Sequence, residues 1–287
     1  MECTSQFINA GSNNTPGHTR KAVILAAGMG TRMRKVDAKI ALGLSQEAAA
    51  NAGLKAMIPF GRPFLDYVLT PLADAGIREV CLVIGSAHNE IRDYYSRPGL
   101  CTRLHLTFAV QHSPRGTADA LLAAVDFVGT DSFVVLNSDN YYPPTALAAL
   151  CALEAPGLAG YHRAEMLRQS NNTADRICTF AVIQTDPHGY LEAIIEKPSP
   201  DMLSTLPEPV LLSMNSWRFD QRIFAACRQT RPSARGELEL PDAVMISMRA
   251  FGIRYQVIAC RQAVLDLSTR ADIAPVAARM AELEVRL

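Results

Sequence analysis

Leu25-Ala26-Ala27-Gly28-Met29-Gly30-Thr31-Arg32 decides the fold of this chain, because it directly follows the apolar run Ala22-Val23-Ile24. An apolar run that ends in small residues and two glycines predicts a buried strand followed by a loop that a ligand can approach closely. Successive N–H groups in such a loop form an anion-binding concavity, and Arg32 adds a planar cation suited to phosphate oxygens. The stretch therefore predicts a phosphate-binding loop, with a purely structural strand-to-helix turn as the alternative.

The loop differs from the two best-known phosphate-binding motifs. A dinucleotide-binding fingerprint would have a glycine at Met33, and a Walker loop would close on Gly-Lys-Ser/Thr. The loop instead resembles the Leu-Ala-Ala-Gly-x-Gly-Thr-Arg loop of the sugar-1-phosphate nucleotidyltransferases. This family includes the glucose-1-phosphate thymidylyltransferases and uridylyltransferases, which make nucleoside-diphosphate sugars. The resemblance implies that a nucleoside triphosphate contacts the whole stretch, that is Leu25, Ala26, Ala27, Gly28, Met29, Gly30, Thr31 and Arg32.

The composition describes a globular chain without a global charge bias. Of its 287 residues 49% are hydrophobic, and Lys+Arg and Asp+Glu number 28 each. This balance argues against nucleic acid or a membrane surface as a partner. Seven scattered cysteines without a CxxC pair favour reduced thiols in the cytoplasm. No apolar run reaches the roughly 20 residues that span a bilayer. Residues 1–20 lack the apolar core of a signal peptide and predict a disordered tail.

Apolar runs alternate with helix-like segments through the first half of the chain. We expect strands at Ala22–Leu25, Val80–Ile84, Leu104–Val110 and Phe133–Leu136. We expect helices at Ser45–Asn51, Phe64–Ala75, Thr117–Val128 and Thr145–Glu154. Such alternation is typical of a largely parallel sheet covered on both faces, which binds ligands at the carboxyl ends of its strands. We therefore predict an α/β, Rossmann-like three-layer sandwich with a largely parallel mixed sheet. The resemblance adds a small β-rich sugar-binding lobe to one domain at 21–287, with 21–155 mainly for the nucleotide and 156–287 mainly for the sugar phosphate.

The family also has a catalytic lysine in a Pro-Lys motif followed by an apolar run and a glycine turn. Lys55 has the matching position, but Leu54 replaces the proline and the preceding segment, Val36–Gly53, is longer than in the family pattern. The resemblance implies that Lys55 binds the triphosphate. Lys35 and Lys39 are the other candidates, and a plain surface lysine is the structural alternative.

The segment Gln111–Ala120 follows the third predicted strand and matches the family pattern Gln-x-x-Pro-x-Gly-Thr-Ala at every fixed position. Gln111 offers both a donor and an acceptor, which suits the edge of a base. Gly116 permits a close backbone approach, and Thr117 can cap the helix that follows. The resemblance implies that Gln111, Pro114, Gly116 and Thr117 contact the nucleotide, whereas an ordinary loop with a helix cap is the structural alternative.

Leu136-Asn137-Ser138-Asp139-Asn140 ends the fourth predicted strand on a carboxylate. An ionised Asp at this point is a hard oxygen ligand of the kind that Mg²⁺ requires, although an Asx turn would also explain it. The segment resembles the family's Gly-Asp-Asn, which implies nucleotide contact at Ser138, metal binding at Asp139 and sugar-phosphate contact at Asn140. Asp266-Leu267-Ser268-Thr269 resembles the family's Asp-x-Gly-Thr, which implies that Asp266 is the second metal ligand.

The second half of the chain predicts a hairpin, with strands at Arg176–Gln184 and Tyr190–Ile195 around an Asp-Pro-His-Gly turn. Glu196 and Lys197 follow in a Glu-Lys-Pro motif. In the family this glutamate accepts hydrogen bonds from sugar hydroxyls and this lysine meets the sugar phosphate. A solvated Glu-Lys pair is the structural alternative.

Three differences from the family fall where the resemblance places the acceptor pocket. Ala181 replaces a glycine whose backbone meets the sugar, and Ser216 and Trp217 alter the strand that carries Asn215. Asn215 is a candidate sugar contact, with an asparagine that satisfies backbone groups at the strand end as the structural alternative. The acids around 237–242 are taken as helix-start charges. A helix at Arg270–Leu287 is expected to end the chain, without the further domain that some relatives append.

The resemblance implies a reaction in which a sugar 1-phosphate attacks the α-phosphorus of a nucleoside triphosphate and releases pyrophosphate. A phosphate monoester has a second pKa near 6 and is largely dianionic at neutral pH, so no histidine base is needed. Catalysis would then be positioning and electrostatic stabilisation. The predicted catalytic residues are Arg32, Lys55, Asp139 and Lys197, with Mg²⁺ held between Asp139 and Asp266.

Two other functions stay open at this point. A catalytically silent relative that binds nucleotide or sugar phosphate would be expected to have lost charged ligands, which this chain retains. A transferase for choline phosphate or a polyol phosphate is compatible with the changes near the acceptor pocket. The pair Asp139-Asn140 resembles the relatives that use UTP or dTTP, and a homo-oligomer is possible.

Overall fold

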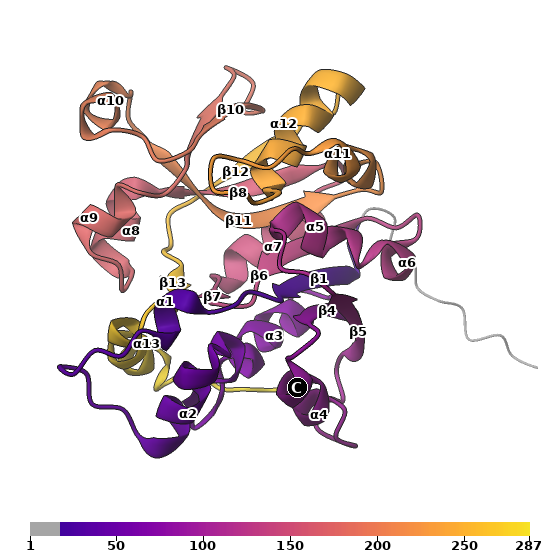
Figure 1. Cartoon of the computed structure of the whole chain (residues 1–287). Helices are drawn as coiled ribbons and strands as arrows, with labels where there is room; N and C mark the ends of the chain where they lie inside the picture. Colours follow the sequence, from indigo (N-terminus) through magenta and orange to yellow (C-terminus); the bar gives the residue numbers. More distant parts are fainter. Residues whose placement is uncertain (1–17) are drawn as a thin grey trace, which may run out of the picture.

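The computed structural model describes residues 18–287. Its centre is a nine-stranded mixed sheet in the order β10-β9-β11-β6-β1-β4-β5, with β8 paired to β11 and β12 paired to β8 (Figure 1). The strands are β1 (Lys21–Ala26), β4 (Glu79–Gly85), β5 (His105–Gln111), β6 (Phe133–Asn137), β8 (Gly157–His162), β9 (Val182–Thr185), β10 (Leu191–Ile195), β11 (Leu211–Phe219) and β12 (Gln256–Cys260). Two short ladders lie outside it, formed by β2 (Pro59–Phe60) with β3 (Arg62–Pro63) and by β7 (Asn140–Tyr141) with β13 (Leu265–Asp266).

The four predicted strands of the first half are confirmed, and they are parallel to one another in the order β6-β1-β4-β5. Strand β1 is central, and its side chains alternate between two hydrophobic cores. Ala22 and Ile24 belong to one core, and Val23 and Leu25 to the other. Because both faces are covered, the strand is apolar throughout rather than alternating with polar residues.

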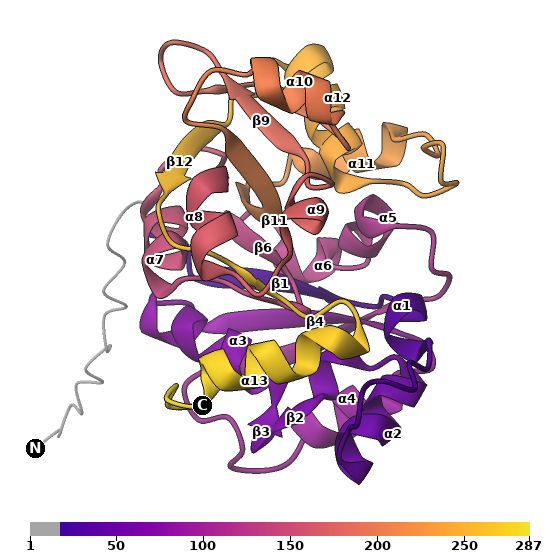
Figure 2. The ribbon, with the colours of Figure 1, turned by 90° about the vertical axis from the view of Figure 1, so that its left-hand side faces the viewer.

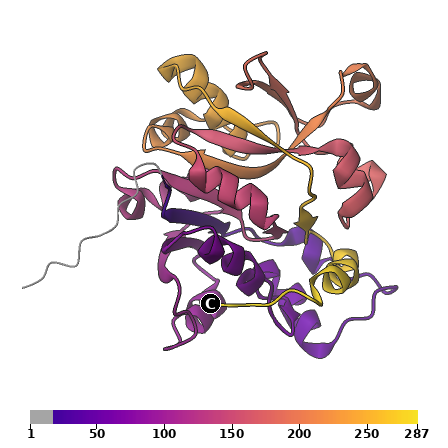
Figure 3. The same ribbon diagram turned by 180° about the vertical axis from the view of Figure 1, so that it is seen from behind.

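Helices cover both faces of the sheet, as predicted. Helices α5, α11 and α12 pack on one side and α3 and α7 on the other (Figures 1 and 3). The helices are α1 (Thr31–Arg34), α2 (Leu44–Ala52), α3 (Phe64–Asp74), α4 (Asn89–Tyr95), α5 (Thr117–Leu122), α6 (Val125–Val128), α7 (Pro144–Ala152), α8 (Arg163–Gln169), α9 (Ala174–Ile177), α10 (Pro200–Thr205), α11 (Ile223–Gln229), α12 (Leu240–Phe251) and α13 (Ile273–Met280), with 3-10 turns η1 (Lys55–Met57) and η2 (Arg270–Asp272).

Three predicted elements are corrected. The helix expected at 117–128 is divided into α5 and α6. The first strand of the predicted hairpin begins at Val182, because residues 174–177 form helix α9. The C-terminal helix ends at Met280, and its first turn is the 3-10 turn η2.

The C-terminal segment returns to the N-terminal half of the molecule (Figures 2 and 3). The backbone N–H of Arg286 donates to Thr70 Oγ1 at 3.1 Å, and Thr102 Oγ1 donates to the Leu287 carbonyl at 3.0 Å. Earlier in the same segment, buried Arg270 donates to the Met33 carbonyl at 3.1 Å, just after the glycine loop. The segment that carries Asp266 is therefore fastened to the half that carries the loop.

The predicted tail, residues 1–20, lies outside the described residues except for its last three. Those three belong to the folded part, because Thr19 is buried and its N–H donates to the Cys151 carbonyl at 2.9 Å. Six cysteines lie in the described part of the chain and carry free thiols, four of them buried. Between residues 18 and 287 no helix has the length and apolar character that crossing a membrane would need.

Candidate active site

A cleft of about 330 Å³ opens at the carboxyl ends of the parallel strands. Its lining includes Lys55 and Asp139. All residues predicted to contact the nucleotide also line it, with the exception of Arg32. They are Leu25, Ala26, Ala27, Gly28, Met29, Gly30, Thr31, Gln111, Pro114, Gly116, Thr117 and Ser138. Four loops that are far apart in the sequence therefore meet at one place, where ligands of parallel sheets bind.

The two glycines of the first loop serve different purposes. Gly30 has φ +59°, and a Cβ there would collide with the backbone of Gly53. A Cβ at Gly28 would meet nothing within 4 Å, so the absence of a side chain leaves open space along the loop. Gly30 is thus needed for the fold, whereas Gly28 keeps the backbone accessible to a ligand.

Arg32 lies on α1, directly after the loop, but does not line the cleft. Its side chain is exposed and makes no hydrogen bond or ion pair with any residue between 18 and 287. In the free protein the side chain of Arg32 is therefore not positioned in the cleft, and its predicted contact with the triphosphate would form only when the ligand binds. Among the described residues no group holds its guanidinium, so its donors are available to a ligand.

Lys55 reaches the cleft because of how the preceding helix ends. Helix α2 is followed by Gly53, which has φ +75°, and the N–H groups of Gly53 and Leu54 donate to the carbonyls of Ala50 and Ala49 at 3.0 Å each. This is the hydrogen-bond pattern of a Schellman motif, and it turns the chain sharply. In this chain the turn that leads into Lys55 is therefore made by Gly53 at the end of α2, without the proline that the family pattern has before the lysine. Lys55 lines the cleft, whereas Lys35 does not.

Two residues of the Gln111–Ala120 segment have defined partners. The amide Nε2 of Gln111 donates to the Gly116 carbonyl at 3.0 Å and to Asp119 Oδ2 at 2.9 Å. Among the described residues no donor contacts the amide oxygen of Gln111. The prediction that Thr117 caps the helix that follows it is wrong. Its Oγ1 instead accepts from the N–H of Leu240 at 2.9 Å, at the start of α12.

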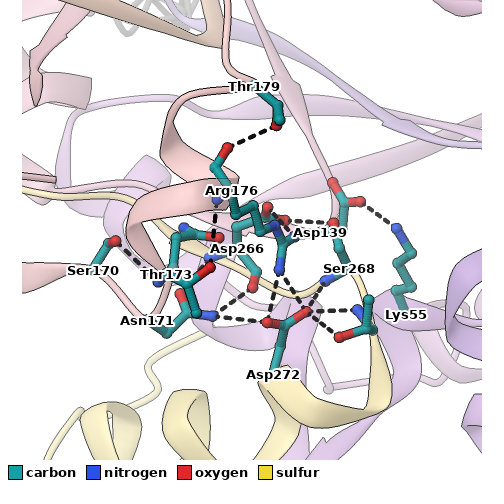
Figure 4. Close-up of polar contacts among 12 residues, drawn as sticks. Lys55, Asp139, Ser170, Asn171, Thr173, Arg176, Thr179, Asp266, Ser268 and Asp272 are labelled. Carbon is teal, nitrogen blue, oxygen red and sulfur yellow. Dashed lines mark hydrogen bonds and ion pairs between the residues drawn. The ribbon is translucent and has the colours of Figure 1, made fainter. Parts of the chain in front are cut away.

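The two predicted metal ligands converge through the short ladder β7–β13. Asp266 lies opposite Asn140 in this ladder, and the N–H of Leu267 donates to the Asp139 carbonyl at 2.9 Å (Figure 4). Burial raises the pKa of Asp266 from 3.8 to about 6, and repulsion from Asp139 adds to the rise. On the other side, Lys55 Nζ is 2.8 Å from Asp139 Oδ2, in an ion pair that is mostly shielded from solvent.

Asp266 is surrounded by residues that the sequence analysis did not single out. Arg176 Nη2 forms an ion pair with its Oδ2, and Ser268 Oγ donates to its Oδ1 at 3.0 Å. Asn171 donates from Nδ2 to the Asp266 carbonyl and accepts at Oδ1 from the Asp266 N–H, both at 2.8 Å. Only the contact with Ser268 could have been anticipated from the neighbouring sequence, because a serine stands there in place of the family's glycine. The others come from α8–α9, which lies about 90 positions earlier in the chain.

The two aspartates fit a magnesium ion. Mg²⁺ is bound by one or two carboxylates and completes its shell with phosphate oxygens and water. Asp139 lines the cleft, whereas Asp266 is buried next to the segment that carries Asp139 and is not part of the lining. The two carboxylates repel each other, and together they supply such a donor set. Within residues 18–287 no cluster of three or more His, Cys, Asp and Glu side chains could hold a metal, so an ion here would depend on oxygens of the ligand.

The residues predicted for the sugar phosphate do not line the cleft. Lys197 and Asn215 nevertheless share an unusual backbone, with φ of +46° and +54°, and among the described residues they are the two non-glycine residues with positive φ. Such strain is typical of functional positions. Glu196 lies near Glu239, and loss of solvent followed by repulsion from Glu239 raises its pKa. Ala181 is buried, and its carbonyl accepts from the N–H of Ser213 at 2.8 Å.

Two of the three changes assigned to the acceptor pocket lie in the core instead. Trp217 is fully buried and stacks on Phe219 with 5.6 Å between ring centroids. Ser216 is buried and its hydroxyl is 3.0 Å from the hydroxyl of Tyr161. The prediction that both side chains shape the acceptor pocket is therefore wrong, and Ala181 is left as the one change that could narrow it.

His88 lines the cleft, although no histidine was assigned there. It is buried after β4, and its Nδ1 is 3.1 Å from the Ala26 carbonyl. The sequence carries no motif around His88, so its place follows only from the fold. Its contact supports the start of the glycine loop.

The chain matches the model of the nucleotidyl transferase family over residues 21–259. It is 28% identical over 225 residues to the low-salt glycan biosynthesis nucleotidyltransferase of Haloferax volcanii, a match that covers 78% of this chain and 56% of that protein. It is 24% identical over 254 residues to the glucose-1-phosphate thymidylyltransferase of Neisseria meningitidis, covering 88% and 80%. A crystal structure of UDP-glucose pyrophosphorylase complexed with UDP-glucose shares the fold, with a TM-score of 0.70, 17% identity, and coverage of 93% of this chain and 100% of that one. The chain therefore belongs to the nucleotidyl transferase family.

Proposed function

We propose that the chain is a sugar-1-phosphate nucleotidyltransferase that condenses a nucleoside triphosphate with a sugar 1-phosphate in the presence of Mg²⁺. The observation that carries this proposal is that Lys55 and Asp139 form an ion pair in the lining of the cleft that the glycine loop also lines, and that the ladder β7–β13 holds Asp266 next to this aspartate. The match to the glucose-1-phosphate thymidylyltransferase of Neisseria meningitidis supports it. A purely structural account of the loop does not explain why the chain keeps Asp266 buried next to Asp139, whose charge repels it.

In the proposed reaction, an oxygen of the sugar phosphate forms a bond to the α-phosphorus of the triphosphate. The bond from this phosphorus to the bridging oxygen breaks, and its electron pair leaves with pyrophosphate. The N–H groups of the loop at Gly28 and Gly30 would hold the phosphates, while Arg32 and Lys55 would offset their charge. A bound magnesium ion would neutralise charge on the triphosphate and on the departing pyrophosphate. Glu196 and Lys197 would hold the sugar phosphate.

No side chain is needed to deprotonate the nucleophile. The sugar phosphate has its second pKa near 6 and is already largely dianionic at neutral pH. The task of the protein is then to overcome repulsion between two polyanions. A cluster of cations around the cleft, rather than a histidine base, is the arrangement that this task favours.

For the base we propose uracil or thymine. The amide nitrogen of Gln111 is used by Gly116 and Asp119, which leaves its amide oxygen for a ligand. A hydrogen-bond acceptor at this place pairs with the N3–H of uracil or thymine and equally with the N1–H of guanine, whereas adenine and cytosine have an acceptor at the corresponding ring nitrogen and offer only an exocyclic amino group. The free oxygen of Gln111 therefore favours UTP and dTTP over ATP and CTP, and the choice of uracil or thymine over guanine rests on the resemblance of Asp139-Asn140 to relatives that use UTP or dTTP.

The test is a substrate matrix with the purified chain, Mg²⁺, five nucleoside triphosphates and several phosphates, including glucose 1-phosphate, choline phosphate and a polyol phosphate. Pyrophosphate release and the nucleotide product would be measured together. We expect turnover with UTP or dTTP and a hexose 1-phosphate, and none in the Asp139→Asn variant. Binding of nucleotide without turnover on any phosphate would contradict the proposal and favour the catalytically silent alternative.

A further inference from the structure

Arg176 lies between two carboxylates at the edge of the proposed metal site (Figure 4). Its Nη1 is 2.8 and 2.9 Å from the two carboxylate oxygens of Asp272, and its Nη2 contacts Oδ2 of Asp266. The side chain is mostly buried, with 18% of it exposed. It is the one cationic side chain, among the described residues, that forms an ion pair with Asp266.

Asp272 alone does not account for this arrangement, because it has other partners. Its Oδ2 accepts from the N–H of Ser268 at 3.0 Å and from the N–H of Thr269 at 2.6 Å, as the acid of a capping box. Asp266 Oδ1 likewise accepts from the hydroxyl of Ser268. Arg176 thus adds a full positive charge to a segment that is already held by neutral donors.

The surrounding segment holds Arg176 and Asp266 in a fixed relation. Asn171 makes two hydrogen bonds to the backbone of Asp266, and the side chain of Thr173 accepts from the N–H of Arg176 at 3.4 Å as the cap of α9. Both ends of the ion pair are therefore anchored by the same loop. A guanidinium anchored in this way does not need to reorganise when a ligand arrives.

The charge of Arg176 has opposite effects on two ligands: it disfavours a free divalent cation and favours a nucleotide. A divalent cation approaching Asp266 without nucleotide meets a unit positive charge already in contact with its ligand, which weakens binding. A triphosphate is a polyanion, so the same charge favours a nucleotide that arrives with its metal. Lys55 stands in the same relation to Asp139, which means that each aspartate of the pair carries its own cation in the free protein.

We propose that Arg176 is a positioning residue that keeps free divalent cations weakly bound at Asp139 and Asp266 and so makes the site select the metal–nucleotide complex. The proposal rests on the proposed function, since it takes these two aspartates as the metal ligands. It concerns the order in which metal and nucleotide bind, which the family does not imply.

The test measures Mn²⁺ binding by the free-ion EPR signal, with and without a non-reactive α,β-methylene analogue of UTP. Arg176→Gln removes the charge and is expected to tighten Mn²⁺ binding without nucleotide by about tenfold or more. It is expected to weaken binding of the Mn²⁺–analogue complex severalfold. The matched control is Arg168→Gln, from the same α8–α9 segment, whose exposed side chain pairs with Glu165 and which should change neither quantity.

The two opposed changes separate the proposal from a structural role. A residue needed only to shape the site would, on removal, weaken both Mn²⁺ alone and the complex. Unchanged or weaker Mn²⁺ binding by folded Arg176→Gln overturns the proposal. A second variant, Arg176→Lys, keeps the charge and can be measured even if Arg176→Gln does not fold. Binding of Mn²⁺ within about threefold of the wild type by Arg176→Lys supports the proposal, and a tenfold tightening contradicts it. If wild-type protein binds Mn²⁺ neither alone nor with the analogue, the metal site of the proposed function fails as well.

Discussion

Replacing Asp266 by asparagine should stabilise the free protein while removing its activity. The side chain of Asp266 is 8% exposed, and burial together with the nearby charge of Asp139 raises the pKa of its carboxyl from 3.8 to about 6. A rise of this size means that the folded state disfavours the ionised form by about 3 kcal/mol. Asparagine has nearly the same shape and can still accept from Ser268, although Arg176 loses one partner. We therefore expect a gain of about 1–3 kcal/mol in the free energy of unfolding near pH 8.

The sign of the pH dependence follows from the direction of the shift. Because the pKa of Asp266 is higher in the folded state than in the unfolded state, the folded protein binds more protons between about pH 4 and pH 6. The stability contribution of this group is therefore greatest in acid and falls as the pH rises through that window. Asp266→Asn has no such group, so its advantage over the wild type should be near zero at about pH 4 and complete above about pH 7.

Urea unfolding followed by circular dichroism, in EDTA at about pH 4.5, 6 and 8, would measure this difference. Asp175→Asn is the matched control, since Asp175 is an exposed aspartate on the neighbouring helix α9. It should show no pH-dependent difference. Equal or lower stability of Asp266→Asn at about pH 8 would refute the claim that this carboxylate is held at a cost in free energy. Addition of Mg²⁺ with nucleotide should stabilise the wild type but not the variant.

Three further outcomes are expected. Lys55→Met should lower kcat by about 10²–10³ in a pyrophosphate-release assay, whereas Lys35→Met should stay within about twofold, and equal losses would contradict the assignment of the lysine. Gly30→Ala should lower the free energy of unfolding by about 1–3 kcal/mol because of its positive φ and its contact with backbone, while Gly28→Ala should keep the melting temperature and weaken nucleotide binding. Arg32→Ala should reduce kcat/KM by about 10²–10³ without changing the melting temperature, since its side chain has no partner within residues 18–287, and normal turnover would remove it from the site.

The parts of the site that could be predicted are those in which a local pattern fixes a local structure. The glycine loop follows an apolar run, and the Gln111 segment and Asp139 each follow a strand, so the parallel order of β1, β5 and β6 brings them to one edge. The fold class is confirmed for the same reason. The alternation of strands and helices that predicts it is visible in the local pattern of apolar residues and needs no knowledge of distant contacts.

The partners of side chains could not be predicted in this way. Thr117 was expected to cap its own helix, and its hydroxyl instead accepts from Leu240, 123 positions later. The turn signal around Asp186 predicts a hairpin strand that begins at Arg176, but Thr173 caps a helical turn there. A side chain with several acceptable local partners is settled by whichever distant segment the fold brings against it, and no local pattern contains that information.

The placement of Asp266 shows how distant segments can still build an accurate site. The ladder β7–β13 contains only two residue pairs, which is too few to hold two segments by itself. Asn171 adds two hydrogen bonds to the backbone of Asp266, and Arg270 ties the same segment to the chain just after the glycine loop. The position of the carboxylate is thus set by contacts from three directions, none of which involves the carboxylate itself. Replacing the charge of Asp266 should therefore change its electrostatics without moving the backbone that carries it, which is the condition on which the stability argument depends.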